Sequence, residues 1–240
     1  MTEPPAKPPI KEALVGACRS AALPAVLLLA PAAALGTWIW PAGLAFVAAS
    51  AALQLASNLA LAKWRPAHFR VRQQSVVAAR GSGQPRGDAI GSAILVGFGA
   101  LWTAFIPLDA LRLHLLPAAA WLAWIGALAA ALGFAVTTLA VWENRFATPN
   151  VQDQTARGQH VVQSGVYSLV RHPIYLGYAL QTAGLALWLG SPAAALIGVG
   201  VYLGATLGRI RIEERDLRAR LPAYEGYAKR VRGRLIPFLL

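Results

Sequence analysis

One polar stretch of the sequence lies directly between two hydrophobic blocks. Its residues with side chains or backbones suited to a ligand site are Gly165, Tyr167, Arg171, His172, Pro173, Tyr175 and Gly177. A run without Lys, Arg, Asp or Glu follows as far as Gly208, and the pair Glu213-Glu214 comes soon after it. Guanidinium, imidazole and carboxylate groups beside membrane-length apolar segments indicate that a polar ligand is bound at a bilayer surface.

Glu213 and Glu214 are predicted to face the protein. On a helix that continues past Gly208, the apolar stripe consists of Ile210, Leu217 and Leu221. Glu214 lies about 40° from this stripe and Glu213 about 60° on its other side, whereas the neighbouring arginines lie roughly 80° or more away and face water or lipid headgroups. An inward carboxylate needs a partner, because stranding it costs several kcal/mol. Two partners are open: Arg171 or Arg145 in an ion pair, or the α-ammonium of a ligand, for which Glu214 is the better candidate.

Pro173 suits the first turn of a helix, where its missing N–H costs nothing. Arg171 and His172 then lie at a helix N-terminus, where free backbone N–H groups favour an anion such as a carboxylate. Gly177 permits close approach of a neighbouring helix or of a ligand. Taken singly, these residues fit a lipid-phosphate anchor, an interfacial tyrosine or a packing glycine. The ordered set favours a ligand site.

The composition identifies a membrane protein that crosses the bilayer several times. Of its 240 residues, 57% are hydrophobic and 13% are charged, against about 25% charged in soluble domains. The predicted fold is all-α, a polytopic bundle of about six transmembrane helices with a cytoplasmic C-terminal helical tail. The predicted spans are Ala21–Trp40, Gly43–Ala62, Ala89–Leu108, Pro117–Trp142, Ile174–Gly190 and Pro192–Gly208. The last two form a short hairpin, and full crossing is favoured over a re-entrant arrangement.

The basic residues are distributed unevenly between the predicted loops. With loops on alternate sides, Arg112 stands alone on one side and the other 21 of the 22 Lys and Arg lie on the opposite side. This asymmetry predicts that both termini are cytoplasmic. The Ala-, Gly- and Pro-rich composition favours a bacterial inner membrane. The charge therefore marks a lipid leaflet and predicts no nucleic-acid partner, and the single cysteine, Cys18, excludes an internal disulfide and a Cys-rich metal site.

The chain is predicted to be one membrane domain, residues 20–240, preceded by an N-terminal cytoplasmic tail, residues 1–19. Polar loops are expected over Lys63–Gly87 and Asn144–Val170. After Gly208 the last span continues as a charged helix, breaks near Pro222 and resumes over Tyr224–Val231. By this topology all of these polar regions share one side of the membrane.

The segment from Asn144 to Pro237 resembles the isoprenylcysteine carboxyl methyltransferase and phospholipid methyltransferase family of integral membrane enzymes. The residues that carry the likeness are His160, Gly165, Tyr167, Arg171, His172, Pro173, Tyr175, Gly177, Glu213, Glu214, Tyr224, Tyr227, Arg234 and Pro237. Lys63-Trp-Arg-Pro66 and Asn144-Arg-Phe146 are weaker common features. Gln163 departs from the pattern, since threonine is commoner there.

The resemblance implies methyl transfer from S-adenosylmethionine to a lipophilic acceptor, with no metal and no covalent intermediate. The implied cofactor-binding part is 144–237. The implied cofactor-binding residues are His160, Gly165, Tyr167, Arg171, His172, Pro173, Tyr175, Gly177, Glu213, Glu214 and Tyr227, and the implied catalytic residues are Arg171, His172 and Tyr175. Glu214 would pair with the cofactor ammonium, His172 and nearby N–H groups with its carboxylate, and Tyr167 or Tyr175 with adenine or the sulfonium. Glu214→Gln is then expected to weaken cofactor binding and leave the protein folded.

The acceptor is left open by the sequence. A prenylcysteine-like or isoprenoid carboxylate, a phospholipid amine and a small thiol all fit, and no oligomeric state is predicted. Three other functions are also open. They are a sterol-reductase-like, NADPH-dependent membrane reductase, a transporter or channel, and a non-catalytic lipid-binding protein. Against the transporter, the predicted spans carry no ionisable residue at mid-depth.

Overall fold

The computed structural model describes residues 9–70, 72, 86–147 and 158–237. All regular structure in these ranges is helical, which confirms the predicted all-α membrane bundle. Contacts between Cα atoms divide the chain into two compact units, Met1–Ser82 and Gly83–Leu240. The sequence had predicted one domain over 20–240, so each unit is described by itself. The central parts of the two predicted polar loops lie outside the described residues.

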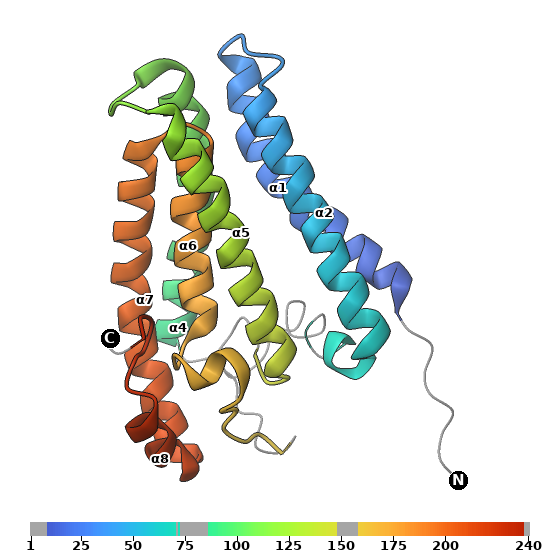
Figure 1. Cartoon of the computed structure of the whole chain (residues 1–240), viewed down its shortest axis with the longest axis vertical. Coiled ribbons are helices and arrows are strands. Elements are labelled where there is room, and N and C mark those ends of the chain that lie inside the picture. The colour runs from blue at the N-terminus through green and yellow to red at the C-terminus, as the bar shows by residue number, and fades with distance from the viewer. Residues whose placement is uncertain (1–8, 71, 73–85, 148–157, 238–240) are drawn as a thin grey trace. The chain divides into compact units, whose positions relative to one another are not determined.

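The first unit is a helical hairpin of α1 (Ile10–Ala34) and α2 (Pro41–Trp64), which pack against each other (Figure 1). Helix α1 begins at Ile10, inside the segment 1–19 that was expected as a tail. No proline interrupts it before Pro24, and Glu12 in its first turn complements the positive helix N-terminus. It ends before the predicted Trp40, because Gly36 takes a φ of +82°, the left-handed conformation that closes helices.

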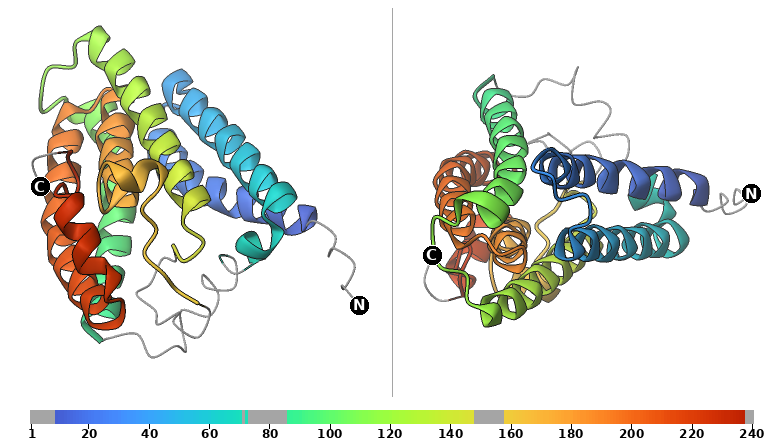
Figure 2. Two further views of the ribbon diagram at one scale, coloured as in Figure 1. Left: turned by 60° about the horizontal axis from the view of Figure 1, so that its bottom comes forward. Right: turned by 90° about the horizontal axis from the view of Figure 1, so that it is seen from above.

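The second unit contains the helices that surround the polar stretch. They are α4 (Arg86–Leu108), the π-helix η1 (Asp109–Leu113), α5 (Ala120–Glu143), the 3₁₀ helix η3 (Gly165–Ser168), α6 (Pro173–Trp188), α7 (Pro192–Arg220) and α8 (Ala223–Arg230). Within this unit α6 packs against both α5 and α7, and α4 packs against α7, as Figure 1 and both views of Figure 2 show. The predicted break near Pro222 is confirmed, because α7 ends at Arg220 and α8 begins at Ala223.

Five of the described helical segments are long and apolar enough to cross a membrane. They are Ile10–Ala34, Pro41–Trp64, Leu95–Leu113, Ala120–Glu143 and Pro192–Arg220. The fifth predicted crossing forms helix α6, but this helix has 16 residues, which rise only about 24 Å. It is therefore shorter than the roughly 30 Å of a bilayer's hydrocarbon core.

Helices α5 and α6 approach closely through two pairs of glycines, Gly133 with Gly177 and Gly126 with Gly184. A Cβ atom added at Gly133 would lie 2.5 Å from the Gly177 carbonyl oxygen, and one at Gly184 would lie 2.7 Å from that of Gly126. Contacts of this length are too short for any side chain larger than hydrogen. The backbones of α5 and α6 therefore touch directly, an arrangement typical of membrane helices.

The turn between α6 and α7 is fixed by a buried carboxylate on η1. Asp109 is 1% exposed and Ser191 is fully buried. The Ser191 hydroxyl donates to Asp109 Oδ2 at 2.5 Å, and the backbone N–H of Leu115 donates to Asp109 Oδ1 at 3.0 Å. A further bond joins α4 to α7: the Trp102 indole N–H donates to the Ala194 carbonyl oxygen at 2.7 Å. These bonds hold α4 and η1 against the start of α7.

Replacing Asp109 with alanine is expected to destabilise the protein by about 1–3 kcal/mol, because the buried Ser191 hydroxyl and the part-buried Leu115 N–H lose their acceptor. Unfolding of the detergent-solubilised chain measures this loss. Asp216→Ala is the matched control, since Asp216 pairs with Arg220 in a partly exposed i,i+4 contact worth only about 0.5 kcal/mol. Equal stability of the two variants would contradict the role given to Asp109.

Candidate functional site

Glu214 is the centre of the polar cluster. Its side chain is 0% exposed, and cationic groups surround both of its oxygens. Oε1 accepts from Arg171 Nε at 2.8 Å and lies 3.3 Å from His172 Nε2. Oε2 accepts from Arg218 at 3.2 Å and lies 3.5 Å from the guanidinium of Arg234. The ion pair with Arg171, one of the two partners left open by the sequence, is therefore present, and the carboxylate has little room for another cation.

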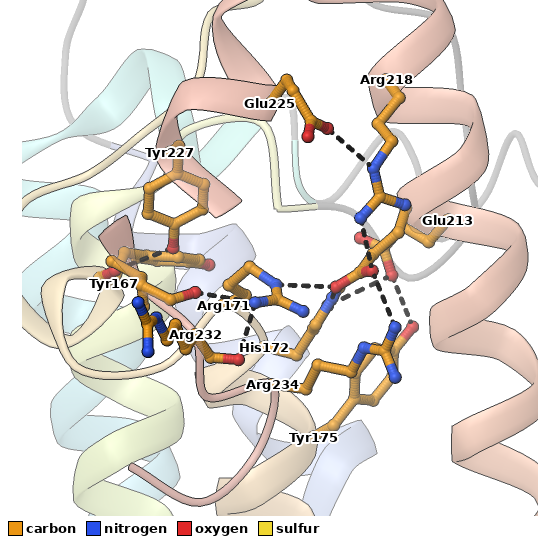
Figure 3. Close-up of polar contacts among 12 residues, drawn as sticks. Tyr167, Arg171, His172, Tyr175, Glu213, Arg218, Glu225, Tyr227, Arg232 and Arg234 are labelled. Carbon is orange, nitrogen blue, oxygen red and sulfur yellow. Dashed lines mark hydrogen bonds and ion pairs between the residues drawn. The ribbon is translucent and has the colours of Figure 1, made fainter. Parts of the chain in front are cut away.

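Arg171 connects three separate parts of the chain. Besides its bond to Glu214 on α7, its guanidinium donates to the carbonyl oxygens of Val231 and Arg232 at 2.7 and 2.8 Å. Its backbone N–H donates to Gly233, and that of His172 donates to Arg234. The segment after α8 thus folds back onto the residues that precede α6, as Figure 3 shows for Arg171 and Arg232.

His172 lies between the two acidic residues. It occupies the N-cap position of α6, ahead of Pro173 at the first helical position, as the sequence predicted. Its imidazole is 3.3 Å from Glu214 at Nε2 and 3.8 Å from Glu213 at Nδ1. Because an ionised carboxylate only accepts hydrogen bonds, the shorter contact requires the proton on Nε2.

Glu213 is the more accessible of the two carboxylates. It accepts a hydrogen bond from the Tyr175 hydroxyl at 3.1 Å, and its side chain is 31% exposed. The Tyr175 ring lies 5.7 Å from the His172 ring. Figure 3 shows Tyr175 reaching from α6 toward Glu213 on α7. An aromatic ring, an imidazole and an open carboxylate therefore meet at this point.

Tyr167 and Tyr227 hold the 3₁₀ helix η3 against α8. The Tyr227 hydroxyl donates to the Tyr167 carbonyl oxygen at 2.7 Å. Burial raises the pKa of Tyr227 to about 12, so this donor keeps its proton throughout the physiological range. On the other side, the side-chain amide of Asn144 donates to the Tyr167 hydroxyl at 3.2 Å. Asn144 was not among the predicted ligand-binding residues, although its position just after the fourth predicted span placed it in the same polar loop.

His160 and Gly165 lie at the edge of the site. The exposed His160 packs edge-on against Phe146, with ring centroids 5.1 Å apart. Gly165 has a φ of +56°, and a Cβ there would lie 3.0 Å from the Glu143 side chain. Glu143 in turn accepts from the Ser164 hydroxyl at 2.9 Å. The structure thus requires glycine at 165 for backbone reasons.

Gly177 faces helix α5. A Cβ added there would meet the Thr137 hydroxyl and lie 2.8 Å from the Gly133 carbonyl oxygen. Packing alone therefore accounts for a glycine at this position, and its contact with a cofactor stays a prediction. Arg218 and Arg234 are the cluster members that were not predicted as ligand-binding residues, although Arg218 follows Glu214 at the i,i+4 spacing of helical ion pairs.

Most of the residues in this cluster lie in a part of the chain that is similar to known proteins. Residues 121–221 match a family model described as phospholipid methyltransferase. Over 117 residues the chain is 33% identical to a protein-S-isoprenylcysteine O-methyltransferase of Saccharomyces cerevisiae, an overlap of 48% of each chain. The chain thus spans about half the length of the curated relative it matches. The region that contains Arg171, His172 and both acidic residues is therefore similar to the isoprenylcysteine carboxyl methyltransferase and phospholipid methyltransferase family.

Proposed function

We propose that the chain is an integral membrane methyltransferase that uses S-adenosylmethionine and a lipophilic acceptor at the cytoplasmic membrane face, in a bacterial inner membrane. The acceptor class is a prenylcysteine-like or isoprenoid carboxylate, or a phospholipid amine. The observation that carries the proposal is the convergence of Arg171 and His172 with Glu213 and Glu214. This cluster lies where α7 passes from an apolar to a charged sequence, inside the region that matches the family.

The exposed side of Glu213 is the best candidate to bind the donor's ammonium group. Glu214 already contacts Arg171, Arg218 and Arg234. Within the described ranges Glu213 has one hydrogen bond, from Tyr175, and 31% of its side chain is exposed. An ionised carboxylate can accept several hydrogen bonds, so Glu213 has unused capacity. Within the family likeness, Glu213 then binds the ligand directly and Glu214 positions Arg171 and His172.

The donor's carboxylate requires hydrogen-bond donors near the start of α6. The backbone N–H groups of Arg171 and His172 already donate to Gly233 and Arg234, and Pro173 has none. His172 and the unused N–H bonds of the Arg171 guanidinium are therefore the candidates. A carboxylate, a tyrosine ring and cationic donors fit the ammonium, sulfonium and carboxylate of S-adenosylmethionine.

S-adenosylmethionine supplies an electrophilic methyl group on a positively charged sulfur. The protein's contribution is to position the two reactants and exclude water from them. A carboxylate acceptor needs no proton removed. For an amine acceptor, the imidazole of His172, whose Nδ1 faces the partly exposed Glu213, takes the released proton.

Incubation of the purified protein with methyl-labelled S-adenosylmethionine and a lipid extract tests the proposal. A labelled lipid identified by mass spectrometry is the expected product. Consumption of NADPH without a labelled product would instead favour the reductase alternative. A lipid-binding protein without activity would yield neither result.

Glu213→Gln is expected to weaken S-adenosylmethionine binding about 10- to 100-fold, because a hydrogen bond to a charged partner becomes a neutral one. Calorimetric titration measures the affinity. Glu225→Gln on α8 is the matched control, because Glu225 is exposed and pairs only with Arg218 and Lys229 among the described contacts. An unchanged affinity in Glu213→Gln would remove this residue from the donor site.

A further inference from the structure

A hollow lined mainly by arginines lies on the charged half of α7. Its volume is about 350 Å³, and its lining residues are Arg211, Glu214, Arg215, Arg218 and Arg234. Four guanidinium groups thus face one carboxylate, an excess of three positive charges. The hollow lies beyond Gly208, where the apolar part of α7 ends, and therefore at the level of lipid headgroups for a helix that crosses the bilayer.

The one carboxylate on the wall of this hollow cannot neutralise all four arginines. Glu214 is fully buried, and one of its oxygens is already shared by Arg171 and His172. Its other oxygen serves Arg218 and Arg234. A second carboxylate, Glu225, contacts Arg218 at 3.3 Å but does not line the hollow.

The positive charges of Arg211 and Arg215 are not balanced by any carboxylate in the described part of the chain. Both are exposed, they lie one helical turn apart, and no carboxylate of the described residues contacts either of them. Like charges at this spacing repel each other. Arg234 adds a buried Nε–H that has no hydrogen-bond acceptor within the described part of the chain. Uncompensated positive charge therefore lines one hollow, next to a buried donor that has no acceptor among the described residues.

We propose that this hollow binds a phosphoryl group, supplied by a phospholipid headgroup or by free phosphate. Arginine is the side chain best suited to phosphate, because its planar guanidinium donates two parallel hydrogen bonds to two oxygens. Four such groups around one hollow match the several acceptor oxygens of a phosphoryl group. This site adds a phosphoryl-binding element to the function proposed above, and because it needs no methyl donor it can be tested separately from methyl transfer.

Calorimetric titration of the detergent-solubilised full chain with three probes tests this site. The probes are dioctanoyl phosphatidic acid, inorganic phosphate, and dioctanoyl glycerol, which has the same chains without phosphate. The test variant is R211Q/R215Q, which removes two arginines that make no described ion pair. The control variant is R19Q/R232Q, which removes the same charge at exposed positions outside the hollow.

Phosphatidic acid is expected to bind the unmodified chain, and R211Q/R215Q is expected to bind it about 30-fold or more weakly, since each lost charged contact is worth roughly a factor of ten. The affinity of the control variant R19Q/R232Q for phosphatidic acid is expected to stay within about twofold of that of the unmodified chain. Binding of inorganic phosphate as well would identify free phosphate as a source, and binding of the lipid alone would identify the headgroup. Equal binding of dioctanoyl glycerol, equal losses in both variants, or no binding of either phosphate probe would overturn the proposal. Because no methyl donor is present, none of these outcomes depends on methyl transfer.

Discussion

Arg171→Met is expected to cost about 3 kcal/mol of stability and to abolish methyl transfer. Methionine keeps much of the apolar length of arginine but none of its five donors. The carbonyl oxygens of Val231 and Arg232 lose their donor, and Glu214 loses its shortest ionic contact. Breaking a buried ion pair from one side typically costs 3–5 kcal/mol. The low end applies here because Arg218 and Arg234 still contact Glu214.

Denaturant unfolding in detergent and the labelled-methyl assay measure the two effects of Arg171→Met separately. Arg232→Met is the neighbouring control, since Arg232 is exposed and contributes its backbone carbonyl, which the substitution keeps. The control is expected to change stability by less than about 0.5 kcal/mol. A stable Arg171→Met variant with full activity would show that the fold does not depend on the bonds from Arg171 to the C-terminal segment.

Gly177→Leu is expected to destabilise the protein by about 3 kcal/mol, the upper part of the usual range for overpacking. The new side chain would point at the Thr137 hydroxyl and at the backbone of Gly133. Backbone atoms cannot move aside as a flexible side chain can, so α5 and α6 must separate. Unfolding in detergent measures the loss of stability.

Two further glycines distinguish packing from ligand binding at position 177. Gly184 forms the next close α5–α6 contact along the same helix. Gly184→Leu is expected to lower stability by a similar amount, because its Cβ would lie 2.7 Å from the Gly126 carbonyl oxygen. Gly204→Leu on α7 is expected to cost little, since nothing lies within 4 Å of a Cβ there. If Gly177→Leu kept its stability and lost only affinity for S-adenosylmethionine, Gly177 would face the cofactor, as the family likeness implied.

The structure also changes the expectation for Glu214→Gln. The sequence alone predicts a folded protein with weakened cofactor binding. With Arg171, Arg218 and Arg234 gathered around the buried carboxylate, its neutralisation leaves three guanidinium groups in mutual repulsion. Loss of stability should therefore accompany any loss of binding, which makes Glu213→Gln the cleaner test of the donor site.

Features set by local sequence could be predicted well. Pro173 and Pro192 both occupy the first residue of a helix, α6 and α7 respectively, and Pro222 separates α7 from α8. Proline fixes its own φ and lacks an N–H, so these boundaries need no knowledge of tertiary contacts. The inward direction of Glu214 likewise followed from the apolar stripe of one helix.

Features set by distant contacts could not be predicted. The return of residues 231–234 to Arg171 and His172 depends on backbone carbonyls, which every residue has and no sequence pattern marks. Arg218 was expected to face away from Glu214, because helical phase describes where a side chain leaves the backbone. Its length allows it to bend back by one turn to the carboxylate. The two-unit organisation also has no local signal.

The short length of α6 bears on how a lipid would reach the site. Arg171 and His172, just ahead of α6, contact Glu214 at the headgroup level, and a helix that rises about 24 Å from there ends inside a hydrocarbon layer of about 30 Å. The site therefore lies beside the headgroups and chains of the lipids in its own leaflet. An acceptor with long chains could then enter sideways by lateral diffusion, and its product could leave by the same route. Neither would have to desorb into water, so turnover would depend on traffic within a single leaflet.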